Sequence, residues 1–142
     1  MVILAVGRPI VPGEAQGSVL LSERSLSLWG GIDPKSGQII DHRHDRYGES
    51  VVGRVFALPS EKGSSTGSAV LLELIRIGKG PAAIITRDPA PILALGSIIA
   101  RELYDVVLPI LLVSVAEFAT LSDGEMVCIT SGGTISSVDE AP

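Results

Sequence analysis

Three short runs of almost purely apolar residues constrain the fold of this chain more than any other feature. They cover residues 51–58, 82–86 and 108–113, and two stretches with helical spacing of apolar residues, 69–77 and 91–104, lie between them. Strands that are apolar at every position, instead of at alternate positions, are typical of a parallel sheet covered on both faces. The sequence therefore predicts an α/β fold with a βαβαβ unit in its C-terminal half.

The N-terminal half lacks this alternation and is expected to be rich in β-strands. Short strands are predicted there and at the end of the chain, at residues 2–6, 17–21, 38–40, 126–130 and 134–136. A short helix is predicted at 116–121, and residues 138–142 are expected to be frayed. No linker or internal repeat divides the sequence, so residues 1–142 are expected to form a single domain.

Charge and hydropathy narrow the class of partner. The net charge is −5 and no cluster of Lys or Arg is present, which argues against nucleic acid as a partner. Apolar residues make up 46% of the chain and the mean hydropathy is +0.44. A small domain cannot bury so much apolar surface alone, so part of it is expected to face another subunit.

The single cysteine and the lengths of the apolar runs indicate which cellular compartment and which cofactor fit this chain. Cys128 cannot form a disulfide within the chain, which fits a reducing cytoplasm. One cysteine cannot hold an iron–sulfur cluster, which takes about four thiolates, so a cluster would need another chain. No apolar run reaches the ~20 residues of a membrane span and no targeting segment is evident, so we expect a cytoplasmic protein without a membrane partner.

The stretch with the most chemical potential is Lys62-Gly-Ser-Ser-Thr-Gly-Ser68, named here the serine loop. It lies between a predicted strand and a predicted helix, where glycines allow tight turns and a helix start offers unpaired N–H groups and positive potential. A hydroxyl there is well placed to stabilise or carry negative charge. The common alternative is that Ser65, Thr66 or Ser68 merely caps the helix.

Two known loop chemistries fit poorly. Residues 63–67 match G-x-S-x-G, the nucleophile elbow of hydrolases, but the histidine of that triad should follow the serine and none occurs after His44. A phosphate loop needs a lysine directly before the Ser or Thr that opens the helix, whereas Lys62 precedes the whole loop. Cradling of an anion by the loop N–H groups remains open.

A charged segment at residues 41–46 contains both histidines, His42 and His44, with Asp41 and Asp45 beside them. A metal site needs three or four well-placed ligands, and two histidines alone are too few. A solvated loop or a patch that faces a partner is the favoured interpretation, and the roles of the two histidines stay open.

The serine loop can instead supply a general base. A serine is a very weak acid, so its alkoxide needs strong local positive charge, which the helix amides, Lys62 and a metal or arginine from a partner can provide. Such a base would abstract a proton next to a carboxylate. The chain shows no evident electrophile for a leaving hydroxyl, so it would not complete an elimination alone.

Four blocks of sequence together resemble a known family. The Gly63-Ser64-Ser65 turn is similar to the Gly-Ser-Ser-Arg loop of the aconitase swivelling domain. More broadly, the chain resembles the small subunit of aconitase X, on the blocks LWGGIDP (28–34), GQIIDHRH (37–44), GSSTGS (63–68) and PILALG (91–96).

This resemblance implies a swivelling β/β/α domain that docks on a large catalytic subunit carrying iron or an iron–sulfur cluster. It implies that Ser64 is the proton acceptor and that Ser65 and Thr66 bind substrate or brace the loop. Thr66 stands where the aconitase loop has its carboxylate-binding arginine, so that role must come from elsewhere. Gly30, Gly31 and Asp33 are expected near the substrate pocket, and this chain itself is expected to bind no metal.

Members of the resembled family dehydrate cis-3-hydroxy-L-proline or mevalonate 5-phosphate. The second branch tends to read Gly-Ser-Thr-Val-Gly-Ser in the loop, and the present Gly-Ser-Ser-Thr-Gly-Ser departs from it. We therefore expect conversion of cis-3-hydroxy-L-proline to 1-pyrroline-2-carboxylate, with the phosphomevalonate reaction as the alternative. A hypothesis of another class is a non-catalytic docking or regulatory module in which Ser64 is only a cap.

Overall fold

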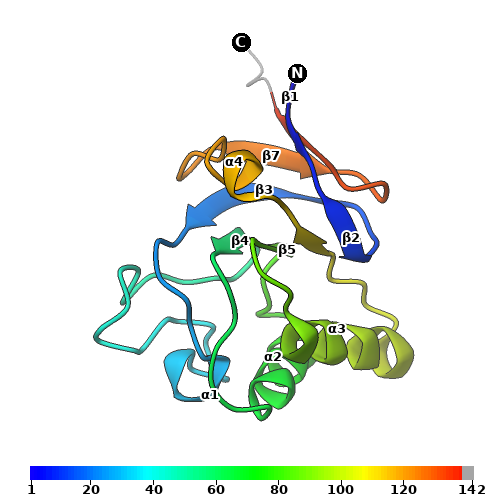
Figure 1. The fold of residues 1–142 in the computed structure, drawn as a ribbon. Helices are drawn as coiled ribbons and strands as arrows, with labels where there is room; N and C mark the ends of the chain where they lie inside the picture. The colour runs from blue at the N-terminus through cyan, green and yellow to red at the C-terminus, as the bar shows by residue number, and fades with distance from the viewer. Residues whose placement is uncertain (139–142) are drawn as a thin grey trace.

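A computed structural model describes residues 1–138; the tail at 139–142, for which fraying was expected, lies outside the described residues. The strands in order are β1 (Val2–Val6), β2 (Arg8–Val11), β3 (Ala15–Leu21), β4 (Val55–Leu58), β5 (Ala83–Thr86), β6 (Ile110–Leu112), β7 (Met126–Ile129) and β8 (Thr134–Ser137). The helices are α1 (Leu28–Gly31), α2 (Gly67–Arg76), α3 (Pro91–Tyr104) and α4 (Val115–Phe118) (Figure 1).

The strands form one sheet in the order β1-β8-β7-β3-β4-β5-β6-β2. Strands β3 to β6 are parallel, and the remaining pairs are antiparallel. The predicted βαβαβ unit is confirmed as β4-α2-β5-α3-β6. Because β1 and β2 are consecutive in the chain but lie at opposite ends of this order, the sheet curls back on itself between them (Figure 1).

The central strands are buried on both faces, which explains their uninterrupted apolar sequences. One core cluster joins strand residues to the helices beneath the sheet, and it includes Phe56, Ile84, Ile110, Leu71 and Leu93. The other fills the space between the parallel strands and the antiparallel layer, and it includes Val55, Ile85, Leu111, Val127 and Ile135. Two strand layers and one helix layer are therefore stacked, with α2 and α3 side by side on one face (Figure 1).

Several boundaries differ from the sequence-based expectation. Strand β4 begins at Val55 instead of residue 51, and residues 38–40 make only isolated bridges, such as Ile32 with Ile39. Strand β2 is not among the predicted strands, because its sequence contains Pro9, which disfavours pairing in a sheet. Since β2 lies at the end of the strand order, the absence of a backbone N–H group on Pro9 is tolerated there. No helix within residues 1–138 is long and apolar enough to cross a membrane.

Gly96 sets the distance between α2 and α3, because a Cβ atom there would lie 2.8 Å from the Ser68 carbonyl oxygen. We expect Gly96→Val to lower the free energy of unfolding by about 1–3 kcal/mol, as overpacking does in other cores. Urea unfolding measures this change. Leu95→Val, at the exposed neighbouring position, is the control and should change stability by less than about 0.5 kcal/mol. A Gly96→Val variant as stable as the parent would contradict the packing argument.

Candidate active site

The serine loop is a compact turn held by its own hydrogen bonds. The Thr66 amide donates to Ser64 Oγ at 3.0 Å, the Gly67 amide to the Ser64 carbonyl at 3.0 Å, and the Ser68 amide to the Ser65 carbonyl at 3.1 Å. Gly63 has φ +85°, where side chains are strained, and a Cβ atom there would collide with the side chain of Ser27. The loop conformation therefore depends on glycine at position 63.

Helix α2 begins two residues earlier than predicted, at Gly67. This changes which groups accept hydrogen bonds from the backbone amides at its start. Thr66 occupies the N-cap position, but its hydroxyl makes no capping hydrogen bond. The Ser68 hydroxyl donates to the Ser65 carbonyl at 2.7 Å, whereas a capping hydroxyl would accept a hydrogen bond from a helix amide. Of the three residues in the alternative that a loop hydroxyl merely caps the helix, Thr66 is at the N-cap position but does not cap through its side chain. Ser64 Oγ accepts the Thr66 amide instead.

The Ser64 hydroxyl has surroundings that favour negative charge on its oxygen. Ser64 is exposed, and its oxygen accepts the backbone N–H of Thr66, the residue directly before the first residue of α2. Hydrogen bonds to the ionised form of a group, together with the positive end of a helix dipole, stabilise that form. Ser65 and Thr66 are exposed beside it.

Glu61, directly before the serine loop, anchors the loop to α3. Its Oε1 atom accepts from the Ile92 amide at 3.0 Å and from the Leu93 amide at 3.3 Å, and its backbone forms a bridge with Leu26. Burial raises the pKa of the Glu61 carboxyl, and the two amides offset part of this effect. Ala90, at the N-cap position of α3, has no side chain that can accept a hydrogen bond, so the Glu61 carboxylate accepts from the first amides of the helix in its place.

A cavity of 470 Å³ adjoins the start of the serine loop. Three segments that are distant in sequence line it, with residues Ser27, Trp29, Gly30, Gly31, Ile40, Asp41, His42, Arg43 and Lys62. The structure thus brings Gly30 and Gly31 together with Lys62. Ser64, Ser65 and Thr66 do not line this cavity themselves.

Asp33 lies in the turn that follows the two glycines and is engaged within it. Its carboxylate accepts from the Lys35 amide and from the Ser36 hydroxyl, both at 2.9 Å. These two hydrogen bonds, the Lys35 amide first, hold the pKa of Asp33 below its usual value. Asp33 is not among the residues that line the cavity, and its expected contact with substrate stays a prediction.

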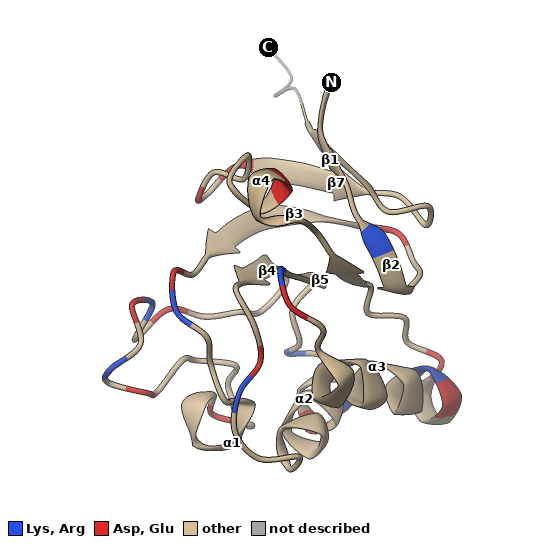
Figure 2. Cartoon of the chain, viewed as in Figure 1, with Lys and Arg blue, Asp and Glu red and all other residues tan. Residues whose placement is uncertain are grey.

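A second cavity, of 230 Å³, adjoins the first and is lined by Arg24, Ser25, Asp41, Arg43, His44 and Lys62. The hydrogen bond from the Arg43 amide is the main cause that lowers the pKa of Asp41, so this carboxylate is ionised at neutral pH. Charged residues of the molecule lie mainly in loops and at helix ends, and the strands carry few (Figure 2). Arg24 and Arg43 were not predicted as site residues, because only the folded chain brings them beside Lys62.

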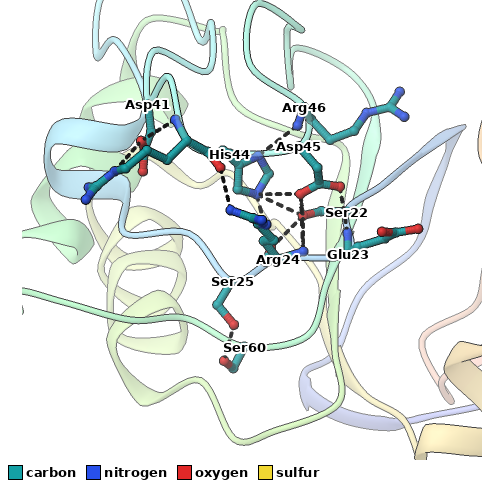
Figure 3. Close-up of polar contacts among 10 residues, drawn as sticks. Ser22, Glu23, Arg24, Ser25, Asp41, His44, Asp45, Arg46 and Ser60 are labelled. Carbon is teal, nitrogen blue, oxygen red and sulfur yellow. Dashed lines mark hydrogen bonds and ion pairs between the residues drawn. The ribbon is translucent and has the colours of Figure 1, made fainter.

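His44 is a buried structural residue in a polar network with Ser22, Arg24 and Asp45 (Figure 3). Its Nδ1 accepts from the Arg46 amide at 3.1 Å, so the ring proton is assigned to Nε2, which lies 2.8 Å from Ser22 Oγ and 3.1 Å from the Arg24 carbonyl. A protonated Nε2 donates to Ser22 and cannot act as its base. The combination of Ser22, His44 and Asp45 is therefore a clamp for the 41–46 segment.

His42 has a different environment. It is exposed, stacks on Tyr47 with ring centroids 4.4 Å apart, and lines the larger cavity. The two histidines are thus not ligands of a common centre, and residues 1–138 contain no group of three His, Cys, Asp or Glu side chains that could hold a metal ion.

Asp45 completes this clamp, and its removal should weaken the fold in a pH-dependent way. Its carboxylate accepts from the Glu23 amide at 2.8 Å and from the Arg24 amide at 3.2 Å. Burial raises the pKa of Asp45, but these amides and the nearby His44 outweigh it, so the folded pKa lies below the ordinary 3.8. The stabilisation is then fully present above pH 3.8 and is lost as the pH falls through the folded pKa.

We therefore expect Asp45→Asn to lower the free energy of unfolding by about 1–2 kcal/mol at pH 7, because an amide replaces a charged acceptor. The deficit relative to the parent should shrink below pH 3.8. Urea unfolding at pH 7 and pH 3 measures both values. An equal deficit at the two pH values would contradict the assigned role of the carboxylate.

Residues 4–137 match the family model described as the aconitase X swivel domain. A cis-3-hydroxy-L-proline dehydratase from Pseudomonas aeruginosa is 50% identical over 107 residues, which are 75% of this chain and 18% of that protein. The chain therefore spans about a fifth of the length of that relative.

Two further relatives are closer to this chain in length. A phosphomevalonate dehydratase small subunit from Thermococcus onnurineus is 45% identical over 94 residues, which are 66% of this chain and 72% of the relative. The crystal structure of aconitase X from Thermococcus kodakaraensis aligns with a TM-score of 0.84 and 34% identity, and covers 95% of this chain and 98% of the matched chain. The curled sheet with helices on one face is thus an arrangement that an experimentally determined relative shares.

Proposed function

This chain belongs to the aconitase X swivel-domain family, and we propose that it is the small subunit of a dehydratase and contributes Ser64 as the proton acceptor. The observation that carries the proposal is the state of the Ser64 hydroxyl. It is exposed on a glycine-dependent turn, its oxygen accepts the Thr66 amide, and a cavity that Lys62 lines lies beside it. We also propose that residues 1–142 act as one domain in the assembly.

The proposed substrate is cis-3-hydroxy-L-proline. Ser64 would take the proton from C2, next to the carboxylate, and loss of the C3 hydroxyl would leave a C2=C3 double bond. The resulting enamine rearranges to 1-pyrroline-2-carboxylate, so the net reaction releases one water. The loop sequence Gly-Ser-Ser-Thr-Gly-Ser and the 50% identity to a protein named for this reaction support the choice. Dehydration of mevalonate 5-phosphate is the alternative, because the matched small subunits carry that name.

Residues 1–138, the part of the chain that the structure describes, do not fit an iron or iron–sulfur site. Cys128 lies on β7 and lines another cavity, with Glu14, Gln16 and Thr130, and the described residues offer no set of three ligands elsewhere. Departure of the C3 hydroxyl needs an electrophile that the described residues do not supply. We therefore propose that a large partner subunit holds the iron and completes the elimination.

Assembly with the large subunit and a dehydration assay test the proposal. The two subunits should copurify, and the complex should convert cis-3-hydroxy-L-proline more efficiently than mevalonate 5-phosphate. Each subunit alone should be inactive. A complex that acts only on mevalonate 5-phosphate would overturn the choice of substrate. A complex that dehydrates neither compound would overturn the proposed reaction.

A further inference from the structure

The two cavities next to the serine loop share an excess of positive charge. Both are lined by Asp41, Arg43 and Lys62, and Arg24 lines the smaller one. Asp41 is the one carboxylate among the residues that line them, so three cations face one anion in a chain whose net charge is −5. A cleft lined mainly by positive side chains attracts negatively charged ligands.

The three cations differ in how far the protein neutralises them. Arg24 donates from Nη1 to the Arg43 carbonyl at 2.9 Å. Arg43 lies 3.4 Å from the Asp41 carboxylate through Nε, and its side chain is 87% exposed, so its terminal nitrogens are available. The side chain of Lys62 makes no hydrogen bond or ion pair with any residue in the described range 1–138, although its charge contributes to the lowered pKa of Asp41.

Lys62 is held close to the proposed base. Its neighbour Glu61 is tied to the first amides of α3, and its other neighbour, Gly63, packs against Ser27. Lys62 and Ser64 are two residues apart, so their Cα atoms lie within about 7 Å of each other. A substrate with its reacting carbon at Ser64 can thus extend a second group toward the ammonium group of Lys62.

Three backbone amides of the serine loop are already engaged within the loop. The amides of Thr66, Gly67 and Ser68 already donate to oxygens of Ser64 and Ser65. Thr66, at the N-cap position of α2, carries no charge. Lys62 and Arg43, which line the adjoining cavities, add full positive charge that these amides do not supply.

We propose that Lys62 and Arg43 together form an oxyanion subsite that binds the carboxylate of the substrate while Ser64 acts on the adjacent carbon. The proposal rests on the proposed function and assigns the anchor for the substrate. The ammonium group of Lys62 contributes a mobile point charge, and the guanidinium of Arg43, positioned by Asp41, contributes directional N–H donors.

Equilibrium binding to the assembled enzyme tests the subsite without turnover. L-proline has the ring and the carboxylate but no hydroxyl to eliminate, and pyrrolidine lacks the carboxylate. Lys62→Gln and Arg43→Gln should each weaken L-proline binding by about tenfold or more and leave pyrrolidine binding unchanged. Lys62→Arg should retain most of the affinity. Lys79→Gln removes the same charge beyond the far end of α2 and should match the parent.

The outcomes separate this subsite from the function on which it rests. If Lys62→Gln binds L-proline as tightly as the parent but turns over slowly, Lys62 acts on Ser64 and the subsite is refuted. If the parent binds inorganic phosphate instead of L-proline and Lys62→Gln loses it, the subsite holds a phosphate ester. If the parent binds neither anion, the subsite is refuted. Full activity of Ser64→Ala would remove the proposed base, while the binding results would still decide the role of Lys62.

Discussion

Ser64→Ala is expected to reduce kcat of the assembled dehydratase by about 10²–10⁴-fold, the range over which positioned acids and bases act. The variant keeps the backbone bonds of the loop, because the Gly67 amide donates to the Ser64 carbonyl and not to its side chain. It loses the oxygen that we propose accepts the proton, and with it the acceptor of the Thr66 amide. Steady-state kinetics with cis-3-hydroxy-L-proline measure the loss, and copurification shows whether the subunits still associate.

The control for this variant is Ser131→Ala, a change of the same size at an exposed position after β7. It should leave kcat unchanged. If Ser64→Ala retains full activity, Ser64 is not the base. If it lowers only the free energy of unfolding, by about 1 kcal/mol, the loop is a structural turn and the docking-module hypothesis is favoured.

Gly63→Ala should have the second largest effect, a loss of about 10²-fold in kcat/KM, because small displacements of a reacting group are costly. The new methyl group would collide with the Ser27 side chain. The backbone at this position also has a φ of +85°, which strains any residue with a side chain. The loop must shift to relieve both problems, and Ser64 is the next residue. Kinetics of the assembled variant measure the loss, and circular dichroism checks that the fold is retained.

Gly132→Ala is the matched control for this second variant. Gly132 lies in the turn before β8, and the nearest atom to a Cβ there is Thr130 Oγ1 at 3.9 Å. This control should behave as the parent. A Gly63→Ala enzyme with the kcat/KM of the parent would show that the position of Ser64 does not depend on the left-handed glycine.

The central part of the fold could be predicted because local sequence and tertiary burial agree there. Strands β4, β5 and β6 are apolar on both faces, since core clusters lie on each side of them. Helix α3 has the predicted bounds, with Pro91 in its first turn. Strand β2 could not be predicted, because only its place at the end of the strand order makes Pro9 acceptable.

The site was only partly predictable for a related reason. The serine loop is contiguous, so residues 62–68 show their pattern in the sequence. The cavity beside it joins Gly30, Arg43 and Lys62 through contacts that span many residues, such as the bridge between Leu26 and Glu61. The buried position of His44 likewise follows from Ser22, far earlier in the chain, and not from the charged residues around it.

The most direct test of the account is a crystal structure of the assembled enzyme with L-proline bound. We expect Ser64 Oγ to lie about 3–3.5 Å from C2 of the ligand, the distance of a reactive contact. This expectation would be contradicted by a structure in which other side chains separate the Ser64 oxygen from that carbon.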